Sequence, residues 1–375
     1  MNRVGVMQIT DTLALGGLER VAVNLANHLP REQFRSYLCV TRGTGPLRES
    51  VAPHVQRLDL NRTGRFDLGA VLRLQRFVAE NDIRILHAHG TSLFIAAASV
   101  FLAAPARRPA LVWHDHFGRS DVQERPAQLY RLATRTAEAV IAVNEPLAKW
   151  SVDKLRMPPG RVWYIRNFVA TPRPEAAPAA PLPGRPGARI VCVANLRPQK
   201  DHLNLLKAMK VVAHHEPDAH LLLAGDAGDK AHLETVRQAI CEWNLGTRVS
   251  WLGPRGDVPS LLKQCDIGVL SSVSEGLPLA LIEYGMAGLA AVATRVGQCA
   301  EVLEDGAAGL LVPPQAPEAL ATALLTLLKS PRLRHELATR FSKRTREFFS
   351  PEAVIRQVSA VYDRVLSSRQ LREAA

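Results

Sequence analysis

The sequence is poor in cysteine and has no long hydrophobic run. Its 375 residues include five cysteines, and no two of them form a CxxC pair. This spacing excludes a zinc ribbon, a thioredoxin-type redox site and a disulfide-rich secreted scaffold. The longest apolar run, Leu93–Ala104, has 12 residues, whereas a membrane-spanning helix needs about 20. We therefore interpret this run as a buried helix.

Residues 1–10 do not have the pattern of a secretory signal, because they become polar too soon. Scattered thiols also fit a reducing compartment, so we expect a cytoplasmic protein. Residues of the class AVILMFWYC make up 47% of the chain and charged residues 22%. These are values of a globular protein, and they exclude a disordered or collagen-like chain.

Positive charge is in excess and unevenly distributed. The net charge is +12, and residues 1–170 hold 23 basic against 14 acidic side chains, a net of +9. Arginines are frequent between Arg107 and Arg135, including Arg119 and Arg125. Such a surface attracts nucleic acid, acidic lipid or phosphorylated substrates. Nucleic acid is disfavoured, because no RNP sequence, Cys/His finger or recognition-helix pattern is present. Two interpretations stay open: peripheral binding to the anionic inner face of the cytoplasmic membrane, or ordinary solvated charge.

Short β-branched runs alternate with helical patterns along most of the chain, which predicts an α/β fold with doubly wound parallel sheets. The alternation stops at residues 170–188, where frequent prolines exclude a helix or central strand. We therefore predict a Rossmann-like lobe at 1–169, a linker at 170–188, a second such lobe at 189–349 and a C-terminal helix within 350–375. Ligands of such sheets bind at the carboxyl ends of the strands, so the expected site is the cleft between the lobes.

The most specific motif lies in residues 266–288, DIGVLSSVSEGLPLALIEYGMAG. A predicted strand is followed by a loop with Glu275 and Gly276, and by a helix that starts near Pro278. Gly276 allows the backbone to approach a ligand closely, and the free N–H groups of a helix start bind anions. Glu283, about one turn deeper, can accept hydrogen bonds from a pair of ribose hydroxyls. The alternative for Glu283 is a solvent-facing charge.

This order of residues resembles the E-x7-E signature of the retaining glycosyltransferases of family 4, which have the GT-B fold. Other stretches similar to family motifs follow in the family's order: Gly16–Arg20 (GGLER), Ala194–Leu206 (ANLRPQKDHLNLL), Leu223–Asp226 (LAGD), Val249–Leu262 (VSWLGPRGDVPSLL), Thr294–Glu301 (TRVGQCAE) and Gly309–Pro314 (GLLVPP). The resemblance spans essentially the whole chain. It implies that the C-terminal lobe binds the donor nucleotide, that the N-terminal lobe binds the acceptor, and that the last helix crosses back to the first lobe.

The resemblance also implies roles in donor binding. Lys200 matches the family's phosphate lysine, Glu275 the contact to the donor sugar, and Glu283 the ribose contact. The family's partner arginine falls at Asn195, and Arg197 either reaches the phosphates from another angle or points to solvent. The remaining implied donor contacts are Gly16, Gly17, Arg255, Gly276, Leu277 and Pro278. For the two N-terminal glycines, an ordinary strand-to-helix turn is the alternative.

Two histidine pairs stand out in the first half of the chain, His87 with His89 and His114 with His116. HxH spacing in a strand places both side chains on one face, where they can hold a metal or contact substrate. The resemblance favours substrate contact, because the family needs no metal, and the sequence has no DxD. It implies that His114 lies near the reacting carbon and that His89 and His116 line the acceptor site. The choice between His114 and His116 stays open, and a structural role is the alternative for His89.

The function implied is retaining transfer of a hexose-type sugar from a nucleotide diphosphate sugar to a saccharide or lipid-linked acceptor, with no metal or other cofactor. The implied catalytic residues are His114, Glu275 and Lys200. By analogy, such enzymes build surface polysaccharides and glycoconjugates. The departing phosphate oxygen would take the proton of the attacking hydroxyl. Two alternatives remain, a GT-B nucleotide-sugar epimerase and a nucleotide-sugar-binding subunit without catalysis. The sequence does not identify the sugar, the base or the acceptor.

Overall fold

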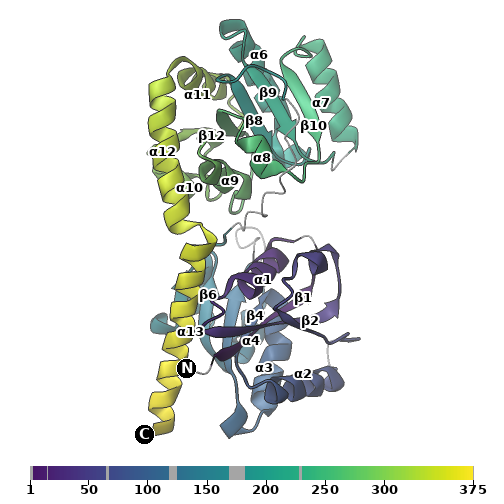
Figure 1. Cartoon of the computed structure of the whole chain (residues 1–375), viewed down its shortest axis with the longest axis vertical. Coiled ribbons are helices and arrows are strands. Elements are labelled where there is room, and N and C mark those ends of the chain that lie inside the picture. Colours follow the sequence, from purple (N-terminus) through teal and green to yellow (C-terminus); the bar gives the residue numbers. More distant parts are fainter. Residues whose placement is uncertain are drawn as a thin grey trace. The chain divides into compact units, whose positions relative to one another are not determined.

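The chain forms two compact units. The computed structural model describes residues 3–14, 16–64, 67–117, 125–168, 182–227 and 230–374. The first unit comprises Met1–Phe168 and Pro351–Ala375, and the second comprises Val169–Ser350 (Figure 1). Arg119 and residues 170–181 of the predicted linker lie outside the described residues. In these ranges, no helix combines the length and the apolar character that a membrane span requires.

The first unit is built on a seven-stranded sheet in the order β3-β2-β1-β4-β5-β6-β7. All of its neighbouring strands are parallel. Its strands are β1 (Val4–Thr12), β2 (Phe34–Gly43), β3 (Gln56–Asp59), β4 (Ile83–His89), β5 (Ala110–Asp115), β6 (Ala137–Ala142) and β7 (Val162–Tyr164). The central strands are buried on both faces, and most of their residues are apolar. The buried exceptions include Gln8 of β1, His87 and His89 of β4, and His114 of β5.

Helices cover both faces of this sheet. They are α1 (Gly17–His28), α2 (Leu68–Glu80), α3 (Leu93–Leu102), α4 (Ala127–Thr134), α5 (Glu145–Asp153) and α13 (Pro351–Ala374). The chain moves from β1 toward β2 through α1, but in the opposite direction through α2, α3 and α4. Because such crossovers are right-handed, α2, α3 and α4 cover the face opposite α1. Helix α13, the last in the chain, packs against α1 and β6 of this first unit (Figure 1).

The second unit repeats the architecture with a six-stranded parallel sheet in the order β10-β9-β8-β11-β12-β13. Its strands are β8 (Arg189–Val193), β9 (His220–Ala224), β10 (Val249–Gly253), β11 (Ile267–Leu270), β12 (Ala290–Thr294) and β13 (Leu310–Val312). Its helices are α6 (His202–His215), α7 (Lys230–Glu242), α8 (Val258–Leu262), α9 (Leu279–Ala287), α10 (Cys299–Val302), α11 (Pro317–Lys329) and α12 (Pro331–Phe348). In both units the strand order reverses beside the first strand, between β1 and β4 and between β8 and β11.

The predicted pair of doubly wound parallel sheets is confirmed, and one local prediction is confirmed only in part. The run Leu93–Ala104 does form a helix, α3, yet that helix is not buried all round. Phe101 is 72% exposed and Leu102 is 51% exposed. An apolar run tells how many apolar side chains a helix carries, whereas the number of neighbouring elements decides how many of them are covered.

Candidate active site

The point where the second sheet reverses gathers charged groups from two loops. The loop after β8 carries Lys200, and the loop after β11 carries Glu275. Lys200 Nζ lies 2.5 Å from Glu275 Oε1, and Ser272 Oγ donates to the same oxygen at 2.6 Å. The Glu275 side chain is 8% exposed and that of Lys200 is 20% exposed. Two residues 75 apart in sequence therefore form a nearly buried ion pair where doubly wound sheets bind ligands.

Further hydrogen bonds hold these two loops together. The Val273 N–H donates to Gln199 O at 2.9 Å, and Ser271 Oγ donates to Lys200 O at 2.9 Å. The backbone on either side of the lysine is thus tied to the loop that carries the carboxylate. A side chain supported in this way loses less freedom when it binds a ligand.

The loop after β12 closes against the same carboxylate loop. Gly297 has φ +49°, and a Cβ atom built there would lie 2.0 Å from Glu275 O. Only glycine fits at this position, because the backbones touch and the φ angle is left-handed. Gln298 N–H also donates to Gly276 O at 3.1 Å. This glycine is part of the TRVGQCAE stretch, but the sequence does not reveal that its neighbour is Glu275.

Helix α9 starts at the ion pair. Pro278 occupies its N-cap, and among the described residues no side chain caps its first turn. The N–H groups there are open to an anion. Gly276 is exposed, Leu277 is half-buried, and Glu283 is half-buried one turn into the helix. The structure thus places five of the predicted donor residues, including Glu275, on one loop and the helix that follows it.

Other predicted donor residues have bonds within the protein. Asn195 Oδ1 accepts from Asp226 N–H at 3.1 Å, which ties the loop after β8 to the loop after β9. Arg255 makes two bonds of 2.6 Å to Asp257, at the start of α8. Arg197 is exposed at the start of the short turn that carries Lys200. The side chain of Asn195 therefore has a clear structural role, whereas that of Arg197 lies at the surface.

In the first unit, the sheet reversal gathers neutral polar groups. Histidines from β4 and β5 meet Gln8 of β1 and Tyr362 of α13. His87 Nδ1 lies 2.6 Å from the Tyr362 hydroxyl, and Gln8 Nε2 donates to the same hydroxyl at 3.1 Å. His89 Nε2 lies 2.9 Å from Gln8 Oε1 and His89 Nδ1 lies 3.0 Å from His116 Nε2. Gln8 and Tyr362 were not predicted as site residues, and no local pattern marks them.

Burial keeps these imidazoles uncharged. It lowers the pKa of His87 and of His116 to about 3. It also lowers the pKa of His89 and His114 well below the ordinary value of 6.5. Both ring nitrogens of His114 are buried and have no hydrogen-bond partner among the described residues. At neutral pH this histidine carries one donor and one acceptor.

The same histidines are near enough to one another to raise the question of a metal. Ring nitrogens of His87, His89 and His114 lie within 4.8 Å of one another. However, His87 and His89 are stacked, with ring centroids 4.6 Å apart and planes 21° apart. Lone pairs lie in the ring planes, so stacked rings do not aim them at one point. Both nitrogens of His89 are also used in hydrogen bonds. A metal would therefore require these rings to turn.

Beside the histidines lies a buried ion pair that the sequence did not reveal. Arg125 makes two bonds to Asp115, one of them 2.8 Å long, and the side chains are 8% and 1% exposed. The Arg125 guanidinium also stacks on the Trp150 ring, 3.9 Å from its centroid. Arg125 was counted in the arginine cluster that faces solvent or membrane. That assignment is wrong, because its charge is neutralised inside the fold.

The two N-terminal glycines lie at the carboxyl end of β1. Gly16 is the N-cap of α1, and Gly17 is its first residue. A Cβ atom at Gly17 would meet nothing within 4 Å, so the fold itself does not require glycine there. Glu19, in the same first turn, accepts from Thr12 Oγ1 at 3.1 Å. The open space beside Gly17 is available to a ligand.

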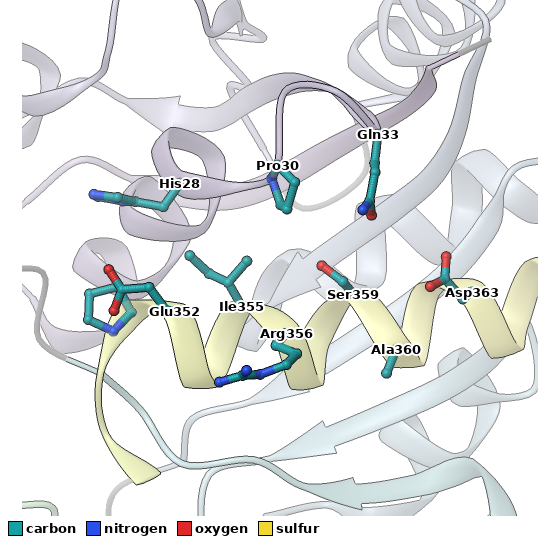
Figure 2. A pocket seen from close by; sticks show the side chains of 10 residues that line it. His28, Pro30, Gln33, Glu352, Ile355, Arg356, Ser359, Ala360 and Asp363 are labelled. Atoms are coloured by element: carbon teal, nitrogen blue, oxygen red, sulfur yellow. The ribbon is translucent and has the colours of Figure 1, made fainter. Parts of the chain in front are cut away.

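A separate groove of about 490 Å³ lies elsewhere in the first unit, between α13 and the segment from α1 to β2. Figure 2 shows Gln33 and Ser359 pointing into it from opposite sides. None of the predicted site residues lines this groove. It is thus distinct from the strand ends described above.

Comparison with known proteins agrees with this geometry. A family model described as "Glycosyltransferase Family 4" matches residues 15–173, and one described as "Glycosyl transferases group 1" matches residues 187–330. The chain therefore belongs to the family 4 glycosyltransferases and has the GT-B fold, as its sequence motifs predicted.

Individual relatives are distant. An N-acetyl-alpha-D-glucosaminyl L-malate synthase from Bacillus anthracis is 30% identical over 178 residues, which cover 47% of this chain and 45% of that protein. The Escherichia coli UDP-Gal:alpha-D-GlcNAc-diphosphoundecaprenol alpha-1,3-galactosyltransferase is 26% identical over 304 residues, which cover 75% of this chain and 77% of that protein. HepE from Anabaena, solved in complex with UDP and glucose, superposes with a TM-score of 0.73 at 18% identity, over 96% of this chain and 100% of its own.

Proposed function

We propose that this protein is a retaining transferase that moves a hexose-type sugar from a nucleotide diphosphate sugar to an acceptor hydroxyl. The Lys200–Glu275 pair at the start of α9 carries this proposal. The leaving diphosphate gains negative charge as the glycosidic bond breaks. A lysine and open helix N–H groups fixed in advance stabilise that charge, and electrostatic stabilisation of this kind often contributes most to catalysis.

Glu275 has a second role in this scheme. Lys200 and Ser272 both bind its Oε1 atom, so its Oε2 atom is the one that can accept from hydroxyls of the donor sugar. Glu283 reads the ribose, and the backbone from Gly276 to Pro278 lines the donor. Gly17, Gly16, Arg255 and Arg197 complete the donor contacts that the family resemblance implies.

His114 is proposed to bond a hydroxyl of the donor or the acceptor near the reacting carbon. It is neutral and buried, with two ring nitrogens free among the described residues. His89 and His116 shape the acceptor side. No side chain needs to form a covalent bond, because the departing phosphate oxygen takes the proton of the acceptor hydroxyl. We propose that the reaction needs no metal.

The acceptor is proposed to be a saccharide or a lipid-linked sugar. The enzyme is proposed to be cytoplasmic and attached peripherally to the membrane. The diphosphoundecaprenol acceptor named for the E. coli relative supports this class, and the UDP and glucose of HepE support a nucleotide sugar donor. Synthesis of surface polysaccharide or glycoconjugate is the corresponding biological role.

A panel of nucleotide sugars, screened by thermal shift, tests the donor class. A ligand at 100 times its Kd stabilises a protein by about 2.7 kcal/mol. Turnover of the best donor is then followed by NMR in buffer with EDTA. A product that keeps the anomeric configuration supports the proposal, whereas an inverted product contradicts it. An epimerase would change the donor without any acceptor, and a binding subunit would bind the donor without turnover.

A further inference from the structure

Exposed apolar side chains of the described residues concentrate on one part of the first unit. Seven large apolar side chains are more than half exposed, and six of these lie on α2, α3 and α4. They are Leu68, Leu72, Phe101, Leu102, Leu129 and Leu132, with exposures from 51% to 72%. Together these six residues are called the apolar face. The seventh, Leu371, lies on α13.

The three helices are neighbours on the same side of the sheet. Gln75 of α2 donates to Ser99 O of α3 at 2.8 Å, and the rings of Phe94 on α3 and Tyr130 on α4 are 5.1 Å apart. On α2 the leucines are four residues apart, and on α4 they are three apart, so each pair lies on one side of its helix. The six side chains therefore lie on three neighbouring helices that cover one side of the sheet.

Exposed arginines that form no ion pair among the described residues border these helices. Residues 84–117 and 125–137 hold six arginines, and their only acidic residue is Asp115, which binds Arg125. Arg84, Arg107, Arg108 and Arg135 are exposed. They lie at the amino ends of β4, β5 and β6, where α3 and α4 also end. On α2 the arginines are instead paired with Asp67 and Glu80, so the unbalanced charge lies beside α3 and α4.

We infer that the apolar face rests on an anionic lipid bilayer, with its leucines and Phe101 among the acyl chains and the arginines at the headgroups. Leucine and phenylalanine bordered by arginine are typical of membrane-surface elements. Protein interfaces are also enriched in phenylalanine and arginine, but the tyrosine, tryptophan and methionine that they favour as well are missing from these six residues. The inference deepens the proposed function, since it names the surface through which the enzyme reaches a lipid-linked acceptor. It also differs from attachment by arginines alone, because inserted side chains are not screened by salt.

Co-sedimentation of the full chain with vesicles tests this inference. The vesicles consist of phosphatidylcholine alone or of equal parts phosphatidylcholine and phosphatidylglycerol. The chain should bind the mixed vesicles and keep a measurable part of that binding at 0.5 M salt. The double variant Phe101→Ser/Leu132→Ser should lower the partition coefficient at least tenfold. The matched control, Val211→Ser/Leu371→Ser, removes two exposed apolar side chains outside the face and should bind like the parent.

Four results would overturn the inference: no binding of the parent to the mixed vesicles, equal binding of both variants and parent, binding lost completely at 0.5 M salt, or a dimer of the parent in light scattering that the face variant abolishes. The last result would assign the face to a second copy of the chain. Melting temperatures equal to the parent's check that the variants fold. Nucleotide affinity is measured in calorimetry without vesicles. A parent that binds vesicles but no nucleotide would contradict the proposed function alone. A parent that binds nucleotide but no vesicles would contradict only this inference.

Discussion

The two units share one topology but place different chemistry at the same structural position. Where the sheet of the second unit reverses, a lysine and a carboxylate form a nearly buried ion pair beside an open helix start. At the corresponding position in the first unit, His87, His89, His116, Gln8 and Tyr362 form an uncharged hydrogen-bonded cluster, and His114 lies beside it. Charged groups suit a diphosphate, and neutral donors and acceptors suit sugar hydroxyls. Topology thus determines where a site lies, and the residues there determine what it binds.

The outer surfaces differ as well. Among the described residues, the second unit has only Val211 and Val273 as exposed large apolar side chains. The first unit carries the apolar face and most of the excess charge. This difference matches a division in which one unit handles a small polar donor and the other meets an acceptor held in a lipid layer.

The largest effect is expected from the charged site of the second unit. Lys200→Ala should lower turnover by roughly 100-fold to 1,000-fold, the usual range for removing one group that stabilises a developing anion. Donor affinity should fall less, because the charge on the diphosphate rises in the transition state. Steady-state kinetics with saturating donor measures the first quantity and calorimetry the second.

Lys207→Ala is the matched control for that experiment, since it removes an exposed lysine of α6, the helix that follows Lys200. It should have a small effect on turnover. Equal turnover of the Lys200 variant and the parent would contradict the assignment of the leaving-group site to the second unit.

A smaller effect is expected one helical turn away. Glu283→Ala should weaken nucleotide binding by about 1.5–3 kcal/mol, the contribution of hydrogen bonds to a charged acceptor. Calorimetry with the nucleoside diphosphate alone measures this loss. A 2′,3′-dideoxy nucleotide should bind the parent and the variant equally, because it lacks the hydroxyls that Glu283 would hold. Unchanged affinity for the ordinary nucleotide would exclude Glu283 as the ribose contact.

The sequence was a good guide to the second unit and a poorer guide to the first. Lys200, Glu275 and Glu283 lie in motifs with fixed spacing, so the family resemblance implied a role for each, and the structure places Lys200 against Glu275. The contacts of Ser272 and Gly297 with Glu275 were not predicted, because a contact between side chains or loops leaves no local sequence pattern.

In the first unit, the sequence did not reveal contacts between side chains that are far apart along the chain. His87 binds Tyr362, which is 275 residues away, and Arg125 is neutralised by Asp115 inside the fold. Charge counts and apolar runs do not state which side chains are covered, and for this reason the apolar face became visible only in the structure.

The smallest effect is expected from the histidine cluster, as a dependence of stability on pH. The pKa of His87 is lowered by burial from 6.5 to about 3. Between these values the unfolded chain binds a proton that the folded chain does not, so stability falls as the pH falls through this window. A single histidine of this kind costs about 2 kcal/mol between pH 6.5 and 4.5, since one pKa unit corresponds to about 1.4 kcal/mol. His87→Gln can keep a hydrogen bond to Tyr362 without taking up a proton. Its free energy of unfolding, from urea titrations, should therefore fall by about 2 kcal/mol less than the parent's over this range.

The control is His335→Gln, at an exposed position on α12, and its free energy of unfolding should fall as the parent's does. If both variants followed the parent, His87 would be protonated in the folded chain, and the contrast between a neutral first site and a charged second site would not hold.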